Sequence, residues 1–188
     1  GTGKTAAFGL PILQKIDTNQ NVPQALILCP TRELCLQIAG DLSDYSKYID
    51  NLRVLPVYGG SSIESQIKSL KRGVQIIVAT PGRLIDLINR RTVELSNVKY
   101  VVLDESDEML NMGFLEDIHF IIEKTPENRQ TLLFSATMPN DIKKIGVKFM
   151  KNPEHIKIAA NEMTADRIDQ YFVKTKEFEK FDVLTRLL

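Results

Sequence analysis

Short apolar runs alternate along the chain with longer stretches in which apolar residues recur every three or four positions. Each short run is apolar almost throughout, as is typical of a strand buried on both faces of a parallel sheet. The predicted strands cover residues 25–29, 52–58, 75–79, 100–103 and 131–134. Strands that alternate with helices predict an α/β domain, with a mostly parallel sheet and helices on both of its faces.

The longer stretches have the period of about 3.6 residues that marks helices with one buried face. The predicted helices cover approximately residues 4–16, 31–48, 62–70, 81–88, 114–123 and 140–149. Between two of these elements, residues 109–113 predict a break in regular structure. Residues 154–159 predict a last strand of the domain.

The sequence changes in character after residue 159 and predicts a second unit. Residues 160–165 are small and polar, which is typical of a linker. Residues 167–174 then predict a strand and residues 177–188 a helix, with little else in the chain for them to pack against. We therefore predict a first domain at residues 1–159, a linker at 160–166 and the start of a second, truncated domain at 167–188.

Composition narrows the functional class only slightly. The chain has 188 residues, enough for a domain with a sizeable core, and 24 basic and 24 acidic residues give it no net charge. Any contact with a polyanion must therefore come from a local site. The two cysteines, Cys29 and Cys35, have no metal-binding spacing and suggest a reducing compartment such as the cytoplasm. No apolar run approaches the roughly 18 residues of a membrane span.

The predicted central strand at 100–103 runs directly into Asp104, Glu105, Ser106 and Asp107. In open α/β sheets, ligands bind in the crevice at the carboxyl ends of the strands, where these acids are expected to lie. Carboxylates in such a crevice, near a phosphate group, are typical ligands of Mg²⁺. The alternative is that the acids only cap the helix that follows.

The first five residues, Gly1, Thr2, Gly3, Lys4 and Thr5, match the end of a phosphate-binding loop. Gly3 would let the backbone approach a phosphate closely, Lys4 would place its charge on the outer phosphates, and Thr5 would offer its hydroxyl to Mg²⁺. The helix that follows would point its positive end at the same anion. The alternative is an unrelated turn, but together with the acidic strand end this string predicts the phosphate and metal clamp of P-loop NTPases.

Polar residues and glycines also follow the other predicted strands. They are Thr31 and Arg32 after the first strand, Gly59 and Gly60 after the second, and Thr80 and Arg83 after the third. Helix capping explains Thr31, and an ordinary turn explains the two glycines. Since all these strand ends should share one edge of the sheet, they also predict a polar rim that can hold phosphate groups.

Six strings, in this order, resemble the motifs of the DEAD-box RNA helicases, superfamily 2 ATPases built from two RecA-like domains. They are the loop that ends at Thr5, Pro30-Thr31-Arg32-Glu33-Leu34, Gly59-Gly60, Thr80-Pro81-Gly82-Arg83, Asp104-Glu105-Ser106-Asp107 and Ser135-Ala136-Thr137. The resemblance covers the whole chain. It implies a RecA-like domain that lacks its first strand and the segment that reads adenine, followed by the first strand and helix of a second RecA-like domain.

The resemblance also implies a role for each matching residue. Gly1, Thr2, Gly3, Lys4 and Thr5 would bind ATP, Thr5 and Asp104 would hold Mg²⁺, and Glu105 would activate the attacking water, so that Lys4, Asp104 and Glu105 form the catalytic set. Asp107, Ser135 and Thr137 would couple the nucleotide state to RNA. Pro30, Thr31, Arg32, Gly59, Gly60, Thr80, Gly82 and Arg83 would hold the RNA backbone without reading its sequence.

The function implied is ATP-dependent RNA unwinding, catalysed together with a second RecA-like domain whose arginines complete the site. Residues 1–188 alone are accordingly expected to hydrolyse ATP hardly at all. The alternatives are a DNA-directed superfamily 2 helicase and an RNA clamp that binds ATP without unwinding. Ser106 stands where the family has Ala, and its hydroxyl needs one partner. Without the first strand, the strands at 25–28 and 131–134 are expected to lose a neighbour.

Overall fold

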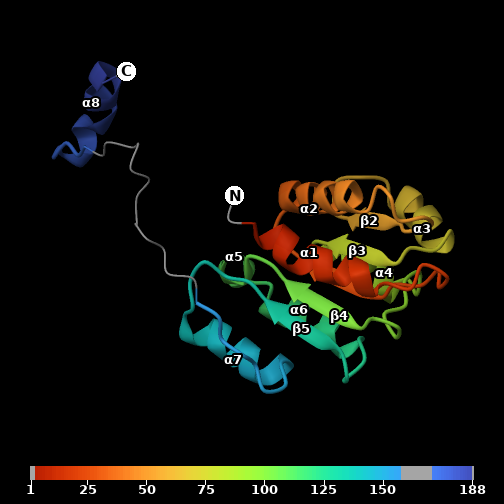
Figure 1. Cartoon of the computed structure of the whole chain (residues 1–188). Coiled ribbons are helices and arrows are strands. Elements are labelled where there is room, and N and C mark those ends of the chain that lie inside the picture. Colours follow the sequence, from red (N-terminus) through yellow and green to blue (C-terminus); the bar gives the residue numbers. More distant parts are fainter. Residues whose placement is uncertain (1–2, 158–170, 188) are drawn as a thin grey trace. The chain divides into compact units, whose positions relative to one another are not determined.

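The computed structural model describes residues 3–157 and 171–187 (Figure 1). The chain divides into two compact units, Gly1–Pro153 and Glu154–Leu188, and each is described here by itself. The predicted linker at 160–166 lies outside the described residues, so the domain limits given above remain predictions. Within the described residues, no helix is both long and apolar enough to span a bilayer.

The first unit contains the predicted parallel sheet. Its strands in the described residues are β1 (Ala25–Leu28), β2 (Val54–Val57), β3 (Ile76–Ala79), β4 (Tyr100–Leu103) and β5 (Gln130–Leu133). They lie in the order β2-β3-β1-β4-β5, and every neighbouring pair is parallel. The predicted parallel sheet is therefore confirmed, and all of these strands end at the same edge.

The helices of this unit are α1 (Lys4–Lys15), α2 (Arg32–Tyr45), α3 (Ile63–Lys71), α4 (Pro81–Asn89), α5 (Ser106–Asn111), α6 (Leu115–Glu123) and α7 (Asn140–Phe149). Hydroxyl side chains cap the first turns of α2 and α3. The N–H of Leu34 donates to the Thr31 hydroxyl, and the N–H of Ser65 donates to the Ser62 hydroxyl. Side-chain caps of this kind satisfy N–H groups that the helix itself leaves unpaired.

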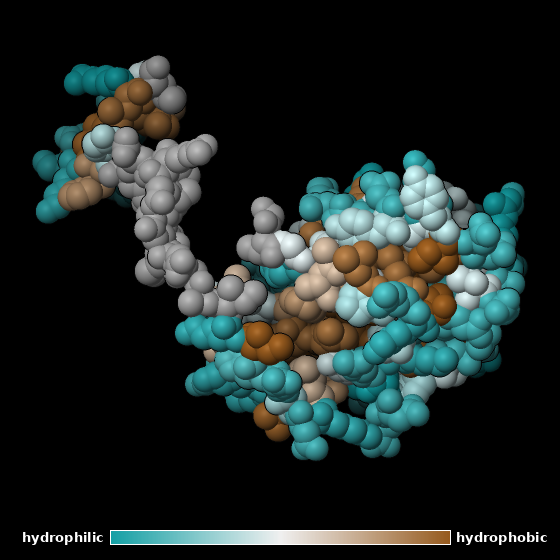
Figure 2. All heavy atoms as spheres, viewed as in Figure 1, coloured by the Kyte–Doolittle hydropathy of each residue, from teal (hydrophilic) through white to brown (hydrophobic). Residues whose placement is uncertain are grey.

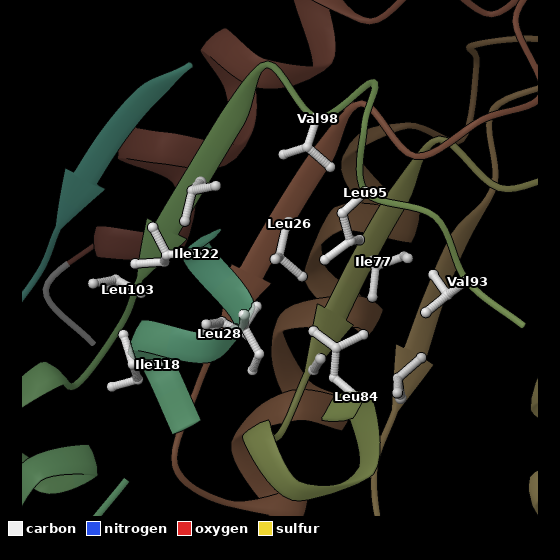
Figure 3. Close-up of a cluster of buried hydrophobic side chains, with 14 of the residues drawn as sticks. Leu26, Leu28, Ile77, Leu84, Val93, Leu95, Val98, Leu103, Ile118 and Ile122 are labelled. Carbon is white, nitrogen blue, oxygen red and sulfur yellow. The ribbon is translucent and has the colours of Figure 1, made fainter. Parts of the chain in front are cut away.

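Two apolar layers sandwich the sheet. On one face, α1 and α2 pack Phe8, Ile12, Ile38 and Leu42 against alternate strand residues such as Ile27 and Val102. On the other face, α4, α6 and α7 cover Leu26, Leu28, Ile77, Val101 and Leu103, which Figure 3 shows in part. Strand residues with consecutive numbers thus enter opposite layers, as the two-residue period of a strand requires.

The predicted break at 109–113 is wrong for most of its length. Met109, Leu110 and Asn111 belong to α5, and of the predicted break only Met112 and Gly113 lie in the turn at 112–114 that precedes α6. Met109 has no exposed surface and joins the core under α4 and α6. Two acids, Asp107 and Glu108, lie in the first turn of α5, where the helix dipole favours negative charge. Core packing and dipole together support a helix too short to have an evident period.

The predicted strand at 154–159 is also wrong where the structure describes it. Residues 154–157 are irregular and exposed, and residues 158 and 159 lie outside the described part. The strand predicted at 167–174 is likewise irregular at 171–174, its described end. In the described chain neither segment has a neighbouring strand. Because a strand needs a neighbour to complete its backbone hydrogen bonds, neither segment forms one. The second unit contains η1 (Glu177–Glu179) and α8 (Lys180–Leu187), whose Phe178 and Phe181 are exposed.

The expectation that two strands would lose a neighbour is half correct. β1 lies in the middle of the sheet with β3 on one side and β4 on the other, so for 25–28 the expectation is wrong. β5 pairs with β4 alone among the described residues, and Thr131, Leu132 and Leu133 are only half-buried. Figure 2 shows apolar side chains exposed over the area of α1 and β5. Sequence alone did not reveal which strand lies at the edge.

Candidate functional site

The carboxyl ends of the strands bring the predicted polar residues to one edge of the sheet. Thr31 follows β1, Gly59 follows β2, Thr80 follows β3 and Asp104 follows β4. The register of each pair aligns these ends, for example Leu28 with Ala79 and with Leu103. The prediction of a shared edge is confirmed. We call the segments 30–32, 58–61 and 80–83 the polar rim.

Lys4 and Asp104 meet at this edge. The Lys4 Nζ lies 4.0 Å from the Asp104 Oδ1, although the two residues are a hundred positions apart. Gly3 precedes α1 in the left-handed conformation, with φ 72°, which glycine adopts without strain. It thereby turns the chain so that Lys4, at the start of α1, reaches the end of β4. Thr5 follows in the first turn of α1, while Gly1 and Thr2 lie outside the described residues.

Asp104 is only 3% exposed, and this burial governs the ionisation of its carboxylate. Burial raises the pKa of Asp104 above its ordinary value, because a desolvated carboxylate is costly to charge. The nearby Lys4 ammonium and the hydrogen bond from the Glu105 N–H oppose that rise in pKa. A buried carboxylate with one distant cation is a group that a further cation would stabilise.

Glu105 adopts an unusual backbone conformation for a residue with a side chain. Its φ and ψ are 48° and 50°, in the left-handed region, immediately before α5 begins. Its N–H donates to the Asp104 Oδ1 at 3.0 Å, which helps to hold the turn. Left-handed conformations cost non-glycine residues about 1 kcal/mol or more and occur preferentially at functional sites. Nothing in the sequence pattern indicated this strain.

Ser106 is buried, and its environment explains why a hydroxyl is tolerated there. The Ser106 Oγ donates to the Leu103 carbonyl at 3.1 Å, and its N–H donates to the Phe134 carbonyl at 3.0 Å. The expectation that one partner would satisfy the hydroxyl is thus confirmed. The second of these bonds also ties the start of α5 to the end of β5.

Asp107 and Thr137 form the next connection between α5 and the segment after β5. The Asp107 Oδ2 accepts hydrogen bonds from the Thr137 N–H at 2.9 Å and from the Thr137 hydroxyl at 2.8 Å. Ser135 lies close enough to favour the ionised carboxylate, but its hydroxyl donates to the Thr137 carbonyl at 2.6 Å. Partial burial raises the pKa of Asp107, but the Thr137 hydrogen bonds outweigh it, so that the pKa lies below the ordinary value.

On the polar rim, Arg32 lies over the face of the Tyr58 ring, with its Cζ 5.0 Å from the ring centroid. Gly60 has φ 81°, and a Cβ built there would meet the Arg32 Nη1 at 3.3 Å. The two glycines, Gly59 and Gly60, are exposed, as is Arg32. Pro30 is buried and shapes the turn after β1. The loops after β1 and β2 therefore lie against each other through Arg32.

The third rim segment is joined to the second by Arg83. Its Nη1 donates to the Ser61 carbonyl at 3.1 Å and to the Gln66 Oε1 at 3.3 Å. Thr80 donates its N–H to the Val57 carbonyl, which aligns the ends of β2 and β3, and Gly82 is exposed in the first turn of α4. Sequence reasoning missed Gln66 altogether, although a Gln on the inward face of an amphipathic helix is the signal that could have found it.

Metal ligands at this edge are few. Among residues 3–157 and 171–187, no group of three or more His, Cys, Asp or Glu side chains is placed to hold a metal ion. A structural zinc or calcium site of protein ligands alone thus has no candidate in the described part. Mg²⁺ differs, because it is commonly held by one or two carboxylates together with water and substrate phosphates. The buried Asp104, and Thr5, which follows Lys4 in the chain, are oxygen donors of the kind that such an ion requires.

A model of the DEAD/DEAH box helicase family matches residues 1–145. The chain belongs to this family. Lys4, the buried Asp104 and the Asp107–Thr137 pair all lie within the matched residues. The match also covers the polar rim and ends within α7.

Curated relatives and a solved structure place this family member more closely. It is 60% identical over 188 residues to the DEAD-box ATP-dependent RNA helicase CshA of Streptococcus pneumoniae and 54% identical to that of Bacillus cereus. Both matches cover all of this chain and 36% of the relative. A crystal structure of a DEAD box protein from Methanococcus jannaschii matches with a TM-score of 0.81 at 44% identity, over all of this chain and 50% of the other. The chain thus spans about a third of the length of these curated relatives.

Proposed function

We propose that the protein to which this chain belongs is an ATP-dependent RNA helicase. The observation that carries the proposal is the meeting of Lys4 with the buried Asp104 at the edge where the polar rim also lies. A phosphate-binding cation, a metal-binding carboxylate and a surface suited to a nucleic-acid backbone are the three parts that coupling of ATP to RNA requires.

In this proposal Lys4 binds the outer phosphates of ATP, and the α1 N-terminus, with Gly1, Thr2, Gly3 and Thr5, surrounds them with N–H donors. Lys4 carries a 36% exposed side chain, so its ammonium is accessible to a ligand while it remains near Asp104. Thr5 and Asp104 would hold Mg²⁺, which when bound neutralises charge that develops on the phosphates. The raised pKa of Asp104 fits this role, because a cation stabilises the ionised carboxylate.

Glu105 is proposed to orient and activate the water that attacks the terminal phosphate. Glu105 directly follows Asp104 and has a left-handed backbone, and in this proposal the two successive carboxylates serve different purposes. Phosphoryl transfer relies on positioning and charge stabilisation more than on a covalent nucleophile, and a single held carboxylate suffices to accept the water proton.

The polar rim is proposed to hold the sugar-phosphate backbone of RNA through Thr31, Arg32, Gly59, Gly60, Thr80, Gly82 and Arg83, with Pro30 shaping the turn. Exposed glycine N–H groups and guanidinium groups recognise phosphates without reading bases. Asp107, Ser135 and Thr137 would transmit the nucleotide state to this surface, because their hydrogen bonds connect the helix after Asp104 with the segment after β5.

The proposal extends to the organisation and location of the protein. Residues 1–159 form the first RecA-like domain, 160–166 a linker, and 167–188 the start of a second RecA-like domain that closes on the same ATP. A cytoplasmic location is proposed with it, since both ATP and RNA substrates are present there. The bacterial relatives are ATP-dependent RNA helicases, which supports this function over a DNA-directed one.

The test is ATP hydrolysis by the full-length protein with and without RNA, compared with its Glu105→Gln and Glu108→Gln variants. Glu105→Gln should still bind ATP and RNA but should lose hydrolysis by about 100-fold or more, as expected for loss of a general base. Glu108, an exposed carboxylate in the first turn of α5, three residues after Glu105, provides the matched control and should retain hydrolysis. Unchanged turnover in Glu105→Gln, or no stimulation of the wild type by RNA, would refute the proposal.

A further inference from the structure

Gln66 is the one buried residue of α3, the helix that lies beside β2 (Figure 1). It is 6% exposed, whereas its neighbours on the helix are exposed or half-buried. The family strings identified in the sequence do not include it. A buried carboxamide is costly unless it is hydrogen-bonded, so its contacts indicate what it holds in place.

Its carboxamide contacts three residues of the polar rim. The Gln66 Nε2 donates to the Tyr58 carbonyl at 3.1 Å and to the Ser61 hydroxyl at 2.6 Å. The Gln66 Oε1 accepts from the Arg83 Nη1 at 3.3 Å. Both amide N–H groups and one acceptor site are therefore used within the rim.

The chemistry of these partners fixes the orientation of the amide. The Tyr58 carbonyl can only accept and the Arg83 guanidinium can only donate, so the nitrogen must face Tyr58 and the oxygen must face Arg83. The Ser61 hydroxyl accepts from the same nitrogen. Neither a carboxylate nor a hydrocarbon of similar size could make all three bonds.

Tyr58 and Ser61 are the residues on either side of Gly59 and Gly60. By holding both of them, Gln66 closes the glycine pair into a short loop of fixed shape. The Tyr58 ring packs against the Arg32 guanidinium, which also lies close to Gly60. Through Arg83, the same carboxamide reaches the first turn of α4. Gln66 thus bonds two segments of the rim directly, and Tyr58 connects the third segment to them through Arg32.

We propose that Gln66 is a positioning residue for RNA, which sets the relative placement of the glycine loop and of Arg83 without touching RNA itself. The inference rests on the proposed function, because it assigns to Gln66 the shaping of the surface proposed above to bind the RNA backbone. Loss of the carboxamide should therefore weaken RNA binding more than it weakens nucleotide binding, whereas a merely structural side chain would affect both through stability.

The chain contains a matched control in Gln75. It has no exposed surface, and its side chain also takes part in three hydrogen bonds, with the Arg53 N–H, the Gln20 carbonyl and the Asn21 Oδ1. Gln75 immediately precedes β3 and therefore lies at the amino edge of the sheet, opposite the rim. Replacing either Gln by Met removes three hydrogen bonds of a buried carboxamide, but only one of the two replacements touches the rim.

The experiment compares wild type, Gln66→Met and Gln75→Met in the full-length protein. Binding of a fluorescent single-stranded RNA is measured with a non-hydrolysable ATP analogue, together with the thermal midpoint and the half-saturating concentrations of RNA and ATP for hydrolysis. Ser61→Ala is a milder variant that removes only the shortest of the three Gln66 bonds, in case Gln66→Met does not fold.

Gln66→Met should weaken RNA binding about tenfold and raise the half-saturating RNA concentration by a similar factor, with a change in that for ATP of less than about twofold. Ser61→Ala should weaken RNA binding about twofold to threefold. Gln75→Met should lower the thermal midpoint comparably but leave RNA affinity within about twofold. Wild-type RNA affinity in both rim variants, or equal losses of RNA affinity in Gln66→Met and Gln75→Met, would overturn the role proposed for Gln66 and leave the proposed function standing. Failure of the wild type to bind RNA would instead overturn the proposed function together with it.

Discussion

The Asp107 Oδ2 accepts two hydrogen bonds from Thr137, one from its N–H at 2.9 Å and one from its hydroxyl at 2.8 Å. The two residues come from different elements: Asp107 lies in the first turn of α5, and Thr137 follows β5. Since α5 begins directly after Asp104 and Glu105, this pair connects the proposed metal and water site with the segment that leads to α7. Its strength can be measured separately from any activity.

A double-mutant cycle with Asp107→Ala and Thr137→Val should give a coupling of about 0.5–1 kcal/mol in urea unfolding at pH 7. A hydrogen bond to a charged group is commonly worth more, but partial exposure reduces the value. Because the folded-state pKa of Asp107 is lowered, this stability is present above the ordinary Asp value of about 3.9 and is lost as the pH falls through the folded-state pKa. Cycles at pH 7 and pH 5 should therefore agree, and a coupling that disappears between them would contradict the assignment. Thr92→Val, whose hydroxyl bonds the Leu87 carbonyl instead, should show no coupling to Asp107.

Asp104→Asn should stabilise the protein in the absence of nucleotide by about 0.5–1 kcal/mol and should abolish Mg²⁺-dependent nucleotide binding. The amide oxygen can still accept from the Glu105 N–H, while the buried charge is removed. The measurements are urea unfolding without metal and calorimetric titration with a Mg²⁺–nucleotide complex.

The pH dependence of that gain follows from the raised pKa of Asp104. In the wild type, the cost of ionising the buried carboxylate appears as the pH rises from about 3.9 through the folded-state pKa, and it is fully present above that. The advantage of Asp104→Asn should accordingly shrink as the pH is lowered toward about 4. Asp86→Asn, at an exposed ion pair with Arg90, is the control and should change stability little. A variant at Asp104 clearly less stable than wild type at pH 7 would show that the Lys4 contact outweighs the burial cost.

Ser106→Ala should change the free energy of unfolding by less than about 1 kcal/mol and leave ATP hydrolysis by the full-length protein within about twofold. The hydroxyl donates to the Leu103 carbonyl, but that carbonyl also accepts from the Phe134 N–H at 2.8 Å, so no buried acceptor becomes unpaired. Ser106→Val, which puts two methyl groups in place of the hydroxyl at a position with no exposed surface, should cost about 1–3 kcal/mol through overpacking. If Ser106→Ala destabilises as much as Ser106→Val, the hydroxyl has a role beyond this bond.

Sequence patterns predicted the strands and helices of the first unit well where burial is complete. β1, β3 and β4 are apolar at consecutive positions because both faces of the sheet are covered, and their carboxyl ends share an edge because the strands are parallel. From this the meeting of Lys4 with Asp104 could be predicted before any coordinates. The N-cap hydroxyls of Thr31 and Ser62 could likewise be predicted from the sequence.

Other features depend on tertiary neighbours that no local pattern contains. The left-handed backbone of Glu105 is held by the Asp104 side chain, and the helical state of Met109 by the core beneath it. Residues 154–157 belong to a predicted strand but have no neighbouring strand in the described chain. Gln66 reads as one polar residue among many until Tyr58, Ser61 and Arg83 surround it. In each of these cases, contacts with other residues decide the structure, and local propensity does not.

The end of α4 offers a last prediction, on stability alone. The N–H of Thr92 donates to the Leu87 carbonyl and that of Arg91 to the Ile88 carbonyl, which together form a Schellman motif. Arg91 is the residue that this motif holds in the left-handed region, with φ 54°. In α3 the equivalent position is Gly73, with φ 85°. Both helices are therefore followed by a left-handed residue, but in α4 that residue carries a side chain that the conformation disfavours.

Arg91→Gly should stabilise the protein by about 0.5–1 kcal/mol in urea unfolding, because it removes a left-handed cost of about 1–2 kcal/mol and adds about 0.5–1 kcal/mol of chain entropy to the unfolded state. Arg91 is exposed, so little packing is lost. Arg72→Gly is the matched control, since Arg72 ends α3 at φ −72° and is also exposed. At that position glycine still adds chain entropy to the unfolded state but relieves no backbone strain, so Arg72→Gly should destabilise the protein. Equal effects of the two substitutions would mean that the conformation of Arg91 stores no strain.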